Sequence, residues 1–386
     1  MSAGRAVSEP MGIARDRNDR AFDCVVVGAG VNGLAAARAL ATTGARTALL
    51  EQFALYHANG SSHGESRSIR HYPAPEWMAL WREAEPLWKE LEEEAGVELL
   101  QRVGVFTHAS ELRSELDSLV RLGVPAEAVD AGEAHRRFGI RLPPGGESYF
   151  DPTSGFILAA RACEALAKSC ADHGVTIIEG AAVSGLKQSP QEVAVSTTAH
   201  GTFTADVAVV TAGAWARGLL APLGIRLPVY VSRETVAYFG APAQAPLPVM
   251  VDYTTADEVT GQGIYALPSP SLGLKVAAHH SGVRSEEVPQ SREPDARVVE
   301  RLTRWVSEHL PQLAGAATRT ETCLYTVAAD EEFLLFREGR VVVGSACSGH
   351  AFKFATATGQ RLASLAATGD LPASLAQQPG PPDAIA

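Results

Sequence analysis

The sequence predicts an α/β fold whose first unit is a parallel strand–helix–strand, and three neighbouring segments support this. The apolar run "CVVVG" at 24–28 is rich in β-branched residues and suits a strand that is buried on both faces. The segment "LAAARALATTG" at 34–44 is typical of a helix of small residues that ends at a glycine. The segment "ARTALLE" at 45–51 predicts a second buried strand, which ends in the acid Glu51.

Three glycines between the first strand and the helix form a GxGxxG turn. Gly28 permits a tight turn, Gly30 lets the backbone approach a pyrophosphate, and Gly33 lets the helix pack closely on the sheet. The amino terminus of the helix favours the negative charge of the phosphates. Glu51 can accept hydrogen bonds from both hydroxyls of an adenosine ribose and disfavours a 2′-phosphate. The combination predicts a Rossmann-like dinucleotide site; the alternative is a glycine-rich turn in an unrelated parallel sheet.

The segment that follows Glu51 favours FAD over NAD. A nicotinamide enzyme usually needs a second half of the Rossmann unit, whereas this chain continues into "YHANGSSHGESRSIRHYP" at 56–73. That stretch is rich in glycine, serine and histidine and carries Arg67 and Arg70. We interpret it as a loop built for polar backbone contacts that wraps a bound flavin.

The composition is that of an ordinary globular protein. The chain has 386 residues, of which 46% are hydrophobic and 20% charged, and a formal net charge of −11, so its affinity for nucleic acid or anionic membranes is expected to be poor. Its 5 cysteines have no repeating spacing, which argues against a disulfide framework or a zinc site and fits a reducing compartment. No apolar run approaches the roughly 20 residues of a membrane span. Residues 1–21 lack the apolar stretch of a secretory signal, so we expect a cytoplasmic protein.

Several stretches of the chain, taken together and in order, resemble the monomeric sarcosine oxidase family. This family includes N-methyltryptophan oxidase and pipecolate oxidase, within the D-amino-acid-oxidase-like flavoproteins. The stretches are the amino-terminal unit described above, "GSSHGESRSIRHYP" (60–73), "VVTAGAW" (209–215), "GLKVAAH" (273–279), "TCLYT" (322–326) and "CSGHAFKFATATG" (347–359). Each motif alone is weak, but their common order is specific, and the resemblance runs from about residue 22 to 372.

The resemblance implies an FAD domain assembled from three separated segments and an interleaved substrate domain with a mixed, largely antiparallel sheet over the flavin face. The FAD segments are expected at 22–98, 153–228 and 320–372, the substrate segments at 99–152 and 229–319, and flexible tails at 1–21 and 373–386. Two patterns support this division independently. Residues 202–215 suggest a strand pair that leads to a turn of small residues, and residues 339–369 suggest a strand, a loop and a helix.

The resemblance also gives a role to Cys323, a lone thiol in "TCLYT". In the family, the matching cysteine forms a thioether with the 8-methyl carbon of the flavin, so the resemblance implies covalently bound FAD with an 8α-S-cysteinyl link. The thiolate is the competent nucleophile, and nearby positive charge is expected to lower its pKa. The alternative is a buried thiol beside non-covalent FAD.

Two cations match the residues that hold the substrate carboxylate in the family, namely Arg70 of "ESRSIR" and Lys353 of "GHAFKF". A guanidinium can bind a carboxylate through two parallel hydrogen bonds, and an ammonium adds a point charge. The alternative for Arg70 is a surface ion pair. The flanking Phe352 and Phe354 indicate that Lys353 lies in a lined pocket and not on a solvated face.

Further site residues follow from the same resemblance. Lys275 matches the lysine that activates oxygen, because a preplaced cation stabilises superoxide; the alternative is a strand lysine that faces solvent. His279 matches an active-site histidine, with His280 as a competing candidate. Arg67 matches an arginine near the flavin, although it could simply pair with Glu65 or another acid. The remaining expected residues are Tyr265 and Tyr325, which line the pocket, and Ser62, His63 and Gly349, which contact the cofactor.

The expected reaction is oxidation of a secondary amino acid, N-methyl or cyclic, by hydride transfer to flavin N5, which gives an imine and, with oxygen, hydrogen peroxide. The expected partners are this small substrate and oxygen, and the expected state is a monomer, with a dimer as the alternative. Two departures put sarcosine itself in doubt: "ALPSPSLGLK" at 266–275 carries two prolines in an expected loop, and Cys347 stands where relatives often have a bulky aromatic residue. The alternatives are a flavin dehydrogenase or desaturase of a cyclic imino acid, and a non-catalytic FAD-binding module.

Overall fold

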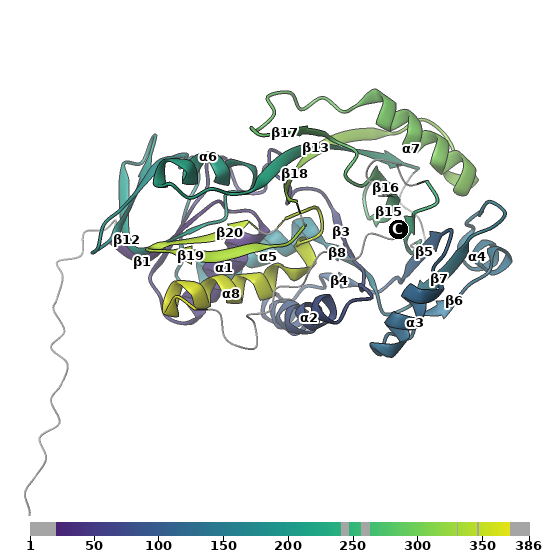
Figure 1. Ribbon diagram of the computed structural model, residues 1–386, viewed down its shortest axis with the longest axis horizontal. Coiled ribbons are helices and arrows are strands. Elements are labelled where there is room, and N and C mark those ends of the chain that lie inside the picture. Colours follow the sequence, from purple (N-terminus) through teal and green to yellow (C-terminus); the bar gives the residue numbers. More distant parts are fainter. Residues whose placement is uncertain (1–20, 241–246, 256–262, 330, 346, 371–386) are drawn as a thin grey trace, which may run out of the picture.

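The computed structural model describes residues 21–240, 247–255, 263–329, 331–345 and 347–370, which form two lobes side by side (Figure 1). The predicted strand–helix–strand unit is confirmed as β1 (Ala21–Val27), α1 (Val31–Thr42) and β2 (Thr47–Leu50). β1 pairs with β2 in parallel, with Cys24 opposite Thr47 and Val27 opposite Leu50. The expected tails lie outside the described residues except for Ala21, which begins β1 and is therefore not part of a tail.

An eight-stranded sheet forms the first lobe. Its main order is β10-β11-β12-β1-β2-β9, and β20 and β19 branch from β12. The additional strands are β9 (Thr176–Ile178), β10 (Val183–Gln188), β11 (Val193–Thr197), β12 (Thr202–Val210), β19 (Leu334–Glu338) and β20 (Val341–Ser345). Cys24 and Val26 of β1 face one core, and Val25 and Val27 face another. Both faces of β1 are therefore covered, which explains its uninterrupted apolar sequence.

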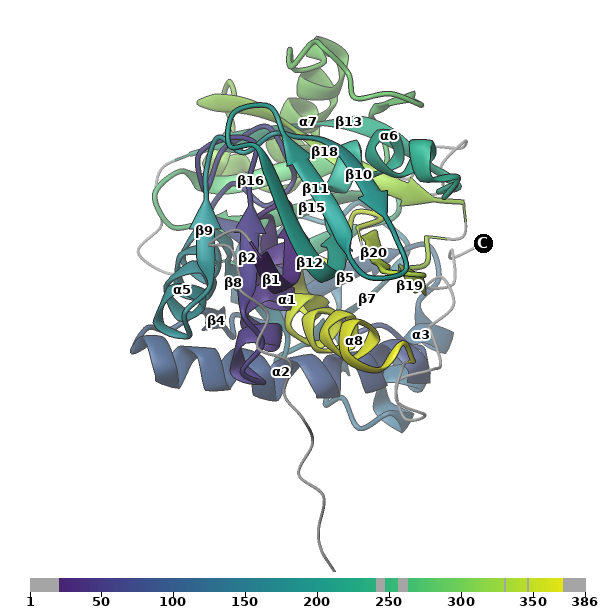
Figure 2. The same ribbon diagram turned by 90° about the vertical axis from the view of Figure 1, so that its left-hand side faces the viewer.

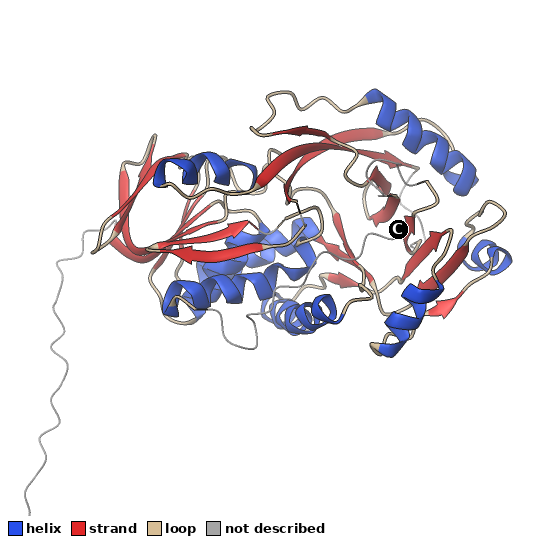
Figure 3. Ribbon diagram, in the orientation of Figure 1, coloured by secondary structure: helices blue, strands red, loops and turns tan. Residues whose placement is uncertain are grey.

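Helices cover one face of this sheet (Figures 2 and 3). They are α1, α2 (Pro75–Ala95), α5 (Ala159–Asp172) and α8 (Ala355–Thr368), and they share one hydrophobic core. The short α6 (Ala216–Leu220) belongs to the core on the opposite face. A Cβ at Gly359 of α8 would lie 2.6 Å from the backbone of Ala35 in α1. The small residues of α1 and α8 thus allow the two helices to approach closely.

A nine-stranded sheet forms the second lobe and is mixed and largely antiparallel, as expected. Its main order is β17-β13-β16-β15-β14-β5-β7-β6, and β18 pairs with β13. The strands are β5 (Val105–Ala109), β6 (Glu127–Ala128), β7 (Glu147–Asp151), β13 (Val229–Phe239), β14 (Val249–Asp252), β15 (Ile264–Ser269), β16 (Gly273–Ala278), β17 (Val283–Ser285) and β18 (Arg319–Ala328). Among the described strands, β14 and β5 form the parallel pair of this sheet.

Three helices accompany the second sheet: α3 (Arg113–Arg121), α4 (Ala131–Phe138) and α7 (Ala296–His309). α7 packs on the sheet through Leu302, Trp305 and Val306, which share a core with Phe106 and Phe239. A small sheet of β3 (Ser66–Ile69), β8 (Gly155–Leu158) and β4 (Leu100–Gln101) lies between the two lobes in Figure 1.

The sheet to which β18 belongs differs from the one that the expected domain segments imply. β18 lies almost entirely within the expected 320–372 FAD segment, yet it pairs along its length with β13 of the second sheet. We therefore propose that the third FAD segment begins after β18, with β19. The expected strand, loop and helix over 339–369 are confirmed as β20, a connecting segment and α8.

Three local expectations are corrected by the structure. Residues 202–215 form one strand, β12, followed by the 3₁₀ turn Gly213–Trp215, and not a strand pair. The expected loop over 56–73 contains β3, which pairs with β8. The expected loop over 266–275 is the β15–β16 hairpin, in which Ser269 pairs with Gly273. No helix within the described residues has the length and apolar character needed to cross a bilayer.

Candidate active site

A continuous cavity of about 1510 Å³ extends from the glycine turn of the first lobe to the strands of the second. It brings together most of the predicted site residues. They are Gly28, Gly30, Glu51, Ser62, His63, Arg67, Arg70, Tyr265, Lys275, His279, Cys323, Tyr325, Gly349 and Lys353. Gly33 does not line the cavity but packs the helix on the turn, since a Cβ there would lie 1.8 Å from the Gly28 carbonyl oxygen. His280 also lies off the lining, with its Nε2 3.3 Å from Glu331 Oε1.

The glycine turn forms one end of the cavity. Gly28 has a φ of 96°, and a Cβ there would lie 2.9 Å from the Thr211 carbonyl oxygen, so only glycine fits without strain. Glu51 Oε2 accepts a hydrogen bond from the Ala29 amide at 2.8 Å, and Oε1 lies 3.2 Å from His57 Nε2. Burial raises the pKa of Glu51, but these hydrogen bonds outweigh it and lower the pKa below its usual value. An ionised acid therefore follows β2 beside the glycine turn, as a ribose site requires.

Ser62 lies at the same end of the cavity as the glycine turn and contacts the start of α1. The Val31 amide at the start of α1 donates a hydrogen bond to Ser62 Oγ at 3.0 Å. A Cβ at Gly30 would lie 3.2 Å from that hydroxyl oxygen. The bare backbone at Gly30 and the free end of α1 are features that suit a pyrophosphate. The residues present therefore fit a dinucleotide.

Arg67 and His63 lie beside this end. Arg67 Nη2 donates to the carbonyl oxygens of Ser61 and His63, both at 2.6 Å. Arg67 does not pair with Glu65, which accepts hydrogen bonds from Ser269 and Ser271 of the hairpin. Burial and the nearby Arg67 lower the pKa of His63 to about 3, so this histidine is neutral. The positive charge of Arg67 is therefore held by backbone dipoles and not cancelled by Glu65.

Cys323 lies on β18 opposite Glu234 of β13 and lines the cavity. Burial raises its pKa to about 11, although Arg67 and Lys275 act to lower it. The expectation of a lowered pKa is therefore wrong in its net direction, although the two expected cations are present. Burial outweighs the two cations because a buried thiolate loses more hydration energy than it gains in attraction to Arg67 and Lys275.

Lys275 lies on β16 and points into the cavity, not into solvent. Its side chain is buried, and Nζ donates to the Ser66 carbonyl oxygen at 3.2 Å. Burial and the neighbouring Arg67 lower its pKa to about 7. It forms no ion pair with any residue that the structure describes. A buried amine of this kind is a common feature of active sites.

Arg70 is buried, so the surface ion pair considered for it is excluded. Its Nη2 donates to Glu115 Oε1 at 2.6 Å, and Nη1 donates to the Tyr253 hydroxyl. Its Nε has no hydrogen-bond partner among the described residues. Arg70 therefore meets an internal carboxylate in this structure.

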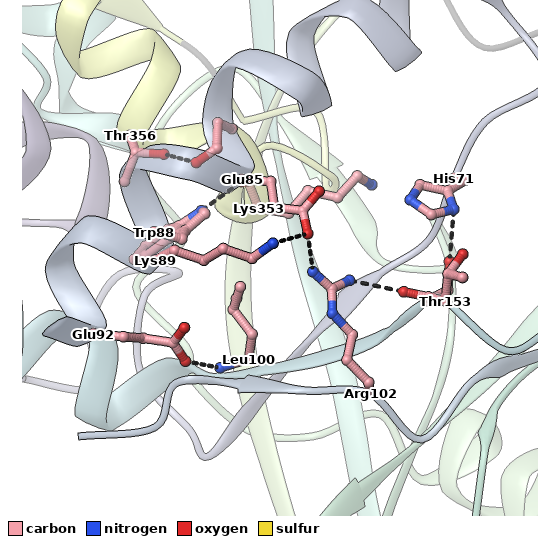
Figure 4. A network of polar contacts seen from close by, with 12 residues as sticks. His71, Glu85, Trp88, Lys89, Glu92, Leu100, Arg102, Thr153, Lys353 and Thr356 are labelled. Carbon is pink, nitrogen blue, oxygen red and sulfur yellow. Dashed lines mark hydrogen bonds and ion pairs between the residues drawn. The ribbon is translucent and has the colours of Figure 1, made fainter. Parts of the chain in front are cut away.

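Lys353 lies in the 3₁₀ turn Phe352–Phe354 and is buried. Its Nζ lies 4.1 Å from the ring centroid of Tyr72 and 4.7 Å from that of Phe354. The aromatic pocket is thus confirmed, but Tyr72 takes the place expected for Phe352, which stacks on Trp88. Trp88 Nε1 donates to the Lys353 carbonyl oxygen at 2.7 Å and fixes this turn (Figure 4). Burial and Arg70 lower the pKa of Lys353 well below its usual value.

Tyr265, Tyr325 and His279 form a chain of polar groups at the cavity wall. The two hydroxyls are 3.5 Å apart, and the Tyr325 hydroxyl lies 3.4 Å from His279 Nδ1. Burial and the neighbouring His280 lower the pKa of His279 well below its usual value, so the ring is neutral. A Cβ at Gly349 would lie 2.5 Å from the Tyr325 ring and 2.6 Å from His279, so glycine is needed there.

The structure adds residues that sequence reasoning missed. The main ones are His57 beside Glu51, and Tyr72, Glu115, Tyr149 and Tyr253 around Arg70 and Lys353. Tyr149 and Tyr253 lie in none of the motifs, whereas Tyr72 lies within the stretch 60–73. Of the two departures, Cys347 lines the cavity, whereas Pro268 and Pro270 of the hairpin do not.

A glycine turn beside an ionised glutamate, opening into a cavity with buried basic residues, defines a two-lobed, nucleotide-dependent enzyme. The chain belongs to the FAD dependent oxidoreductase family, whose model matches residues 23–365. It is 32% identical to peroxisomal sarcosine oxidase of Homo sapiens, over 88% of this chain and 91% of that protein. It is 30% identical to monomeric sarcosine oxidase of Bacillus sp., over 90% of this chain and 93% of that protein.

Solved structures give the same assignment. The open form of NikD, described as an unusual amino acid oxidase essential for nikkomycin biosynthesis, superposes with a TM-score of 0.83 at 27% identity, covering 91% of this chain and 95% of NikD. L-Proline dehydrogenase from P. horikoshii shares the fold, with a TM-score of 0.79 at 20% identity, covering 90% of this chain and 94% of that one. The expected family and fold class are therefore confirmed.

Proposed function

We propose that this protein is an FAD-dependent oxidase of a secondary amino acid, N-methyl or cyclic. The observation that carries the proposal is the placement of the buried cations Arg70, Lys353 and Lys275 in one cavity with a dinucleotide turn. Lys353 and Lys275 have no acidic partner among the described residues, and a buried cation without an anion is costly, so these two lysines mark a site for anionic ligands. The relatives named as sarcosine oxidases act on a small N-methyl amino acid, which supports the substrate class.

The residues of the first lobe would hold the FAD. Gly28, Gly30 and the start of α1 would receive the pyrophosphate, and Glu51 the ribose. When bound, FAD supplies a two-electron acceptor for hydride from the substrate carbon next to nitrogen and returns the electrons to oxygen. The protein supplies position, charge and exclusion of water.

The second lobe would bind the substrate. Lys353 and the free edge of Arg70 would hold its carboxylate. The amine must be neutral before hydride can leave the adjacent carbon, and burial lowers the pKa of an amine. The neutral His279, whose Nδ1 lies 3.4 Å from the Tyr325 hydroxyl, can accept a hydrogen bond from such an amine. Cys347 leaves room that a bulky aromatic residue would fill, so we favour a substrate larger than sarcosine.

Lys275 would provide the positive charge for reaction with oxygen. A cation that is already in place stabilises negative charge on oxygen without reorganisation. We further propose that Cys323 is joined to the flavin by a thioether; its position on the cavity wall near Arg67 and Lys275 supports this. The described cysteines are all free, which supports a reducing, cytoplasmic location, and we propose a monomer.

The test is anaerobic mixing of the purified yellow protein with a panel of N-methyl and cyclic amino acids, followed by flavin absorbance. Bleaching by a secondary amino acid and recovery in air with hydrogen peroxide are expected. Bleaching without recovery in air would indicate a dehydrogenase or desaturase instead. No bleaching by any member would leave a non-catalytic FAD-binding module. Lys275→Met should keep bleaching and lose recovery in air, whereas the exposed Lys187→Met should keep both.

A further inference from the structure

The substrate end of the cavity holds two cations with different electrostatic surroundings. The guanidinium of Arg70 forms an ion pair with Glu115, with Nη2 and Oε1 2.6 Å apart. The Arg70 side chain is 10% exposed and the Glu115 side chain is 8% exposed. Lys353 contacts the rings of Tyr72 and Phe354 and forms no ion pair with any described residue. The Arg70–Glu115 pair therefore contributes no net charge, and Lys353 is the basic group at this end without a carboxylate partner among the described residues.

Glu115 is fixed in this position and is not a side chain that samples solvent. It lies on α3, whose Leu116 and Leu119 are buried against Tyr149 in the same core. The Tyr149 hydroxyl donates to Glu115 Oε1 at 2.6 Å, and the Tyr253 hydroxyl accepts from the other side of Arg70. Buried charge pairs of this kind with additional hydrogen bonds are costly to break.

We infer that Glu115 is a specificity-determining residue that cancels the charge of Arg70, so that the site takes amino acids with one carboxylate and excludes those with an acidic side chain. This inference rests on the proposed function, because it concerns the substrate of the same site. A first carboxylate would meet Lys353 and the remaining edge of Arg70. A second would enter a region in which Glu115 already balances the positive charge of Arg70.

The other charged groups on this wall do not supply a strong site for a second carboxylate. Arg113 on α3 is 75% exposed and lies 3.3 Å from Asp117. Arg121 donates to Ser118 at 2.7 Å, and its side chain is also exposed. Exposed charges are screened by water and salt. Glu111, also exposed on the lining, adds further negative charge.

The experiment compares ligand pairs that differ in charge and hardly in size, with Glu115→Gln and a matched control. N-Methylaspartate and N-methylasparagine serve as substrates, and succinate and succinamate as ligands in calorimetry with the flavin-containing protein. The wild type should prefer the neutral member of each pair by at least about tenfold. Glu115→Gln keeps the acceptor oxygen and removes the charge, so it should shift both ratios toward the acid by about tenfold or more. Glu111→Gln should shift them less than about twofold.

The outcomes separate this inference from the proposed function. Equal use or equal binding of the two members by the wild type would overturn the role of Glu115 without any variant. An unchanged ratio in Glu115→Gln would do the same, and so would binding of neither succinate nor succinamate. If succinamate binds selectively while no N-methyl amino acid bleaches the flavin, the proposed function fails and the role of Glu115 stands.

Discussion

Replacement of Lys275 by methionine should stabilise the flavin-free protein, and by an amount that depends on pH. The pKa of Lys275 falls from the usual 10.5 to about 7, because the amine is buried beside Arg67. Each pH unit of this difference corresponds to about 1.4 kcal/mol, so folding with the charged amine costs about 5 kcal/mol. Methionine has no charge to bury, so Lys275→Met removes this cost.

The direction of the pH dependence follows from proton binding. Between pH 7 and 10.5 the unfolded chain holds a proton at Lys275 that the folded chain has lost, so the contribution of Lys275 to the stability of the wild type rises with pH in this window. The advantage of Lys275→Met should be nearly constant below about pH 7. It should shrink by about 2–3 kcal/mol between pH 6.5 and 9.

The assay is urea denaturation of protein produced in a riboflavin-depleted host, at pH 6.5, 7.5 and 9. The exposed Lys187 on β10 provides the control, and Lys187→Met should change the free energy of unfolding by less than about 0.5 kcal/mol at every pH. A Lys275→Met variant that is less stable than the wild type at pH 6.5 would refute the reasoning. A difference that does not change with pH would refute it too, because the buried amine would then not be the titrating group.

Four further changes test the site. Cys323→Ser should release the yellow colour into the supernatant on acid precipitation, whereas Cys347→Ser, also on the cavity lining, should keep it with the polypeptide. Lys353→Met should raise the substrate concentration needed for half-maximal bleaching at least about tenfold, because a charge-assisted hydrogen bond to the carboxylate is lost. Lys89→Met, at a lysine whose side chain is 58% exposed, should leave this concentration unchanged. An equal effect of the two substitutions would show that Lys353 does not bind the substrate. Arg70→Met should lower the free energy of unfolding in urea melts by about 3–5 kcal/mol, because the Glu115 carboxylate is left without its partner. The double variant Arg70→Met/Glu115→Gln should recover at least half of this loss. Losses that simply add in the double variant would contradict the pairing. Gly33→Ala should abolish flavin retention, since its Cβ would lie 1.8 Å from the Gly28 carbonyl oxygen, while Gly185→Ala, with no atom within 4 Å, should retain it.

The parts of the fold that could be predicted are those whose sequence pattern lies within one short segment of the chain. The first strand, the glycine turn, α1 and Glu51 follow one another within about thirty residues, so their pattern carries both structure and purpose. β18 could not be assigned in this way, because its sheet is decided by pairing with β13, about ninety residues earlier in the chain. Local sequence gives a strand but not its partner.

The same distinction applies to the site. Arg70 and Lys353 were found because each lies in a recognisable motif, but Glu115 lies 45 residues from Arg70 on a helix whose pattern shows only which leucines are buried. The raised pKa of Cys323 was also out of reach. Its cations could be expected from the motifs, whereas its burial depends on the packing of β18 between distant segments.

We propose that pairing with a carboxylate separates structural from functional buried cations in this molecule. Arg38 and Arg361 are buried and each binds a carboxylate, at 2.6 Å from Glu94 and 3.0 Å from Glu83 respectively, away from the cavity lining. Lys275 and Lys353 are equally buried, yet they have no acidic partner in the described part of the chain. A buried ammonium without an anion costs several kcal/mol, and a fold keeps such a group where a ligand supplies the missing charge. Arg70 stands between these classes because Glu115 already supplies its anion, and from this pairing we infer that Glu115, together with Arg70, sets the charge of the acid that the site accepts.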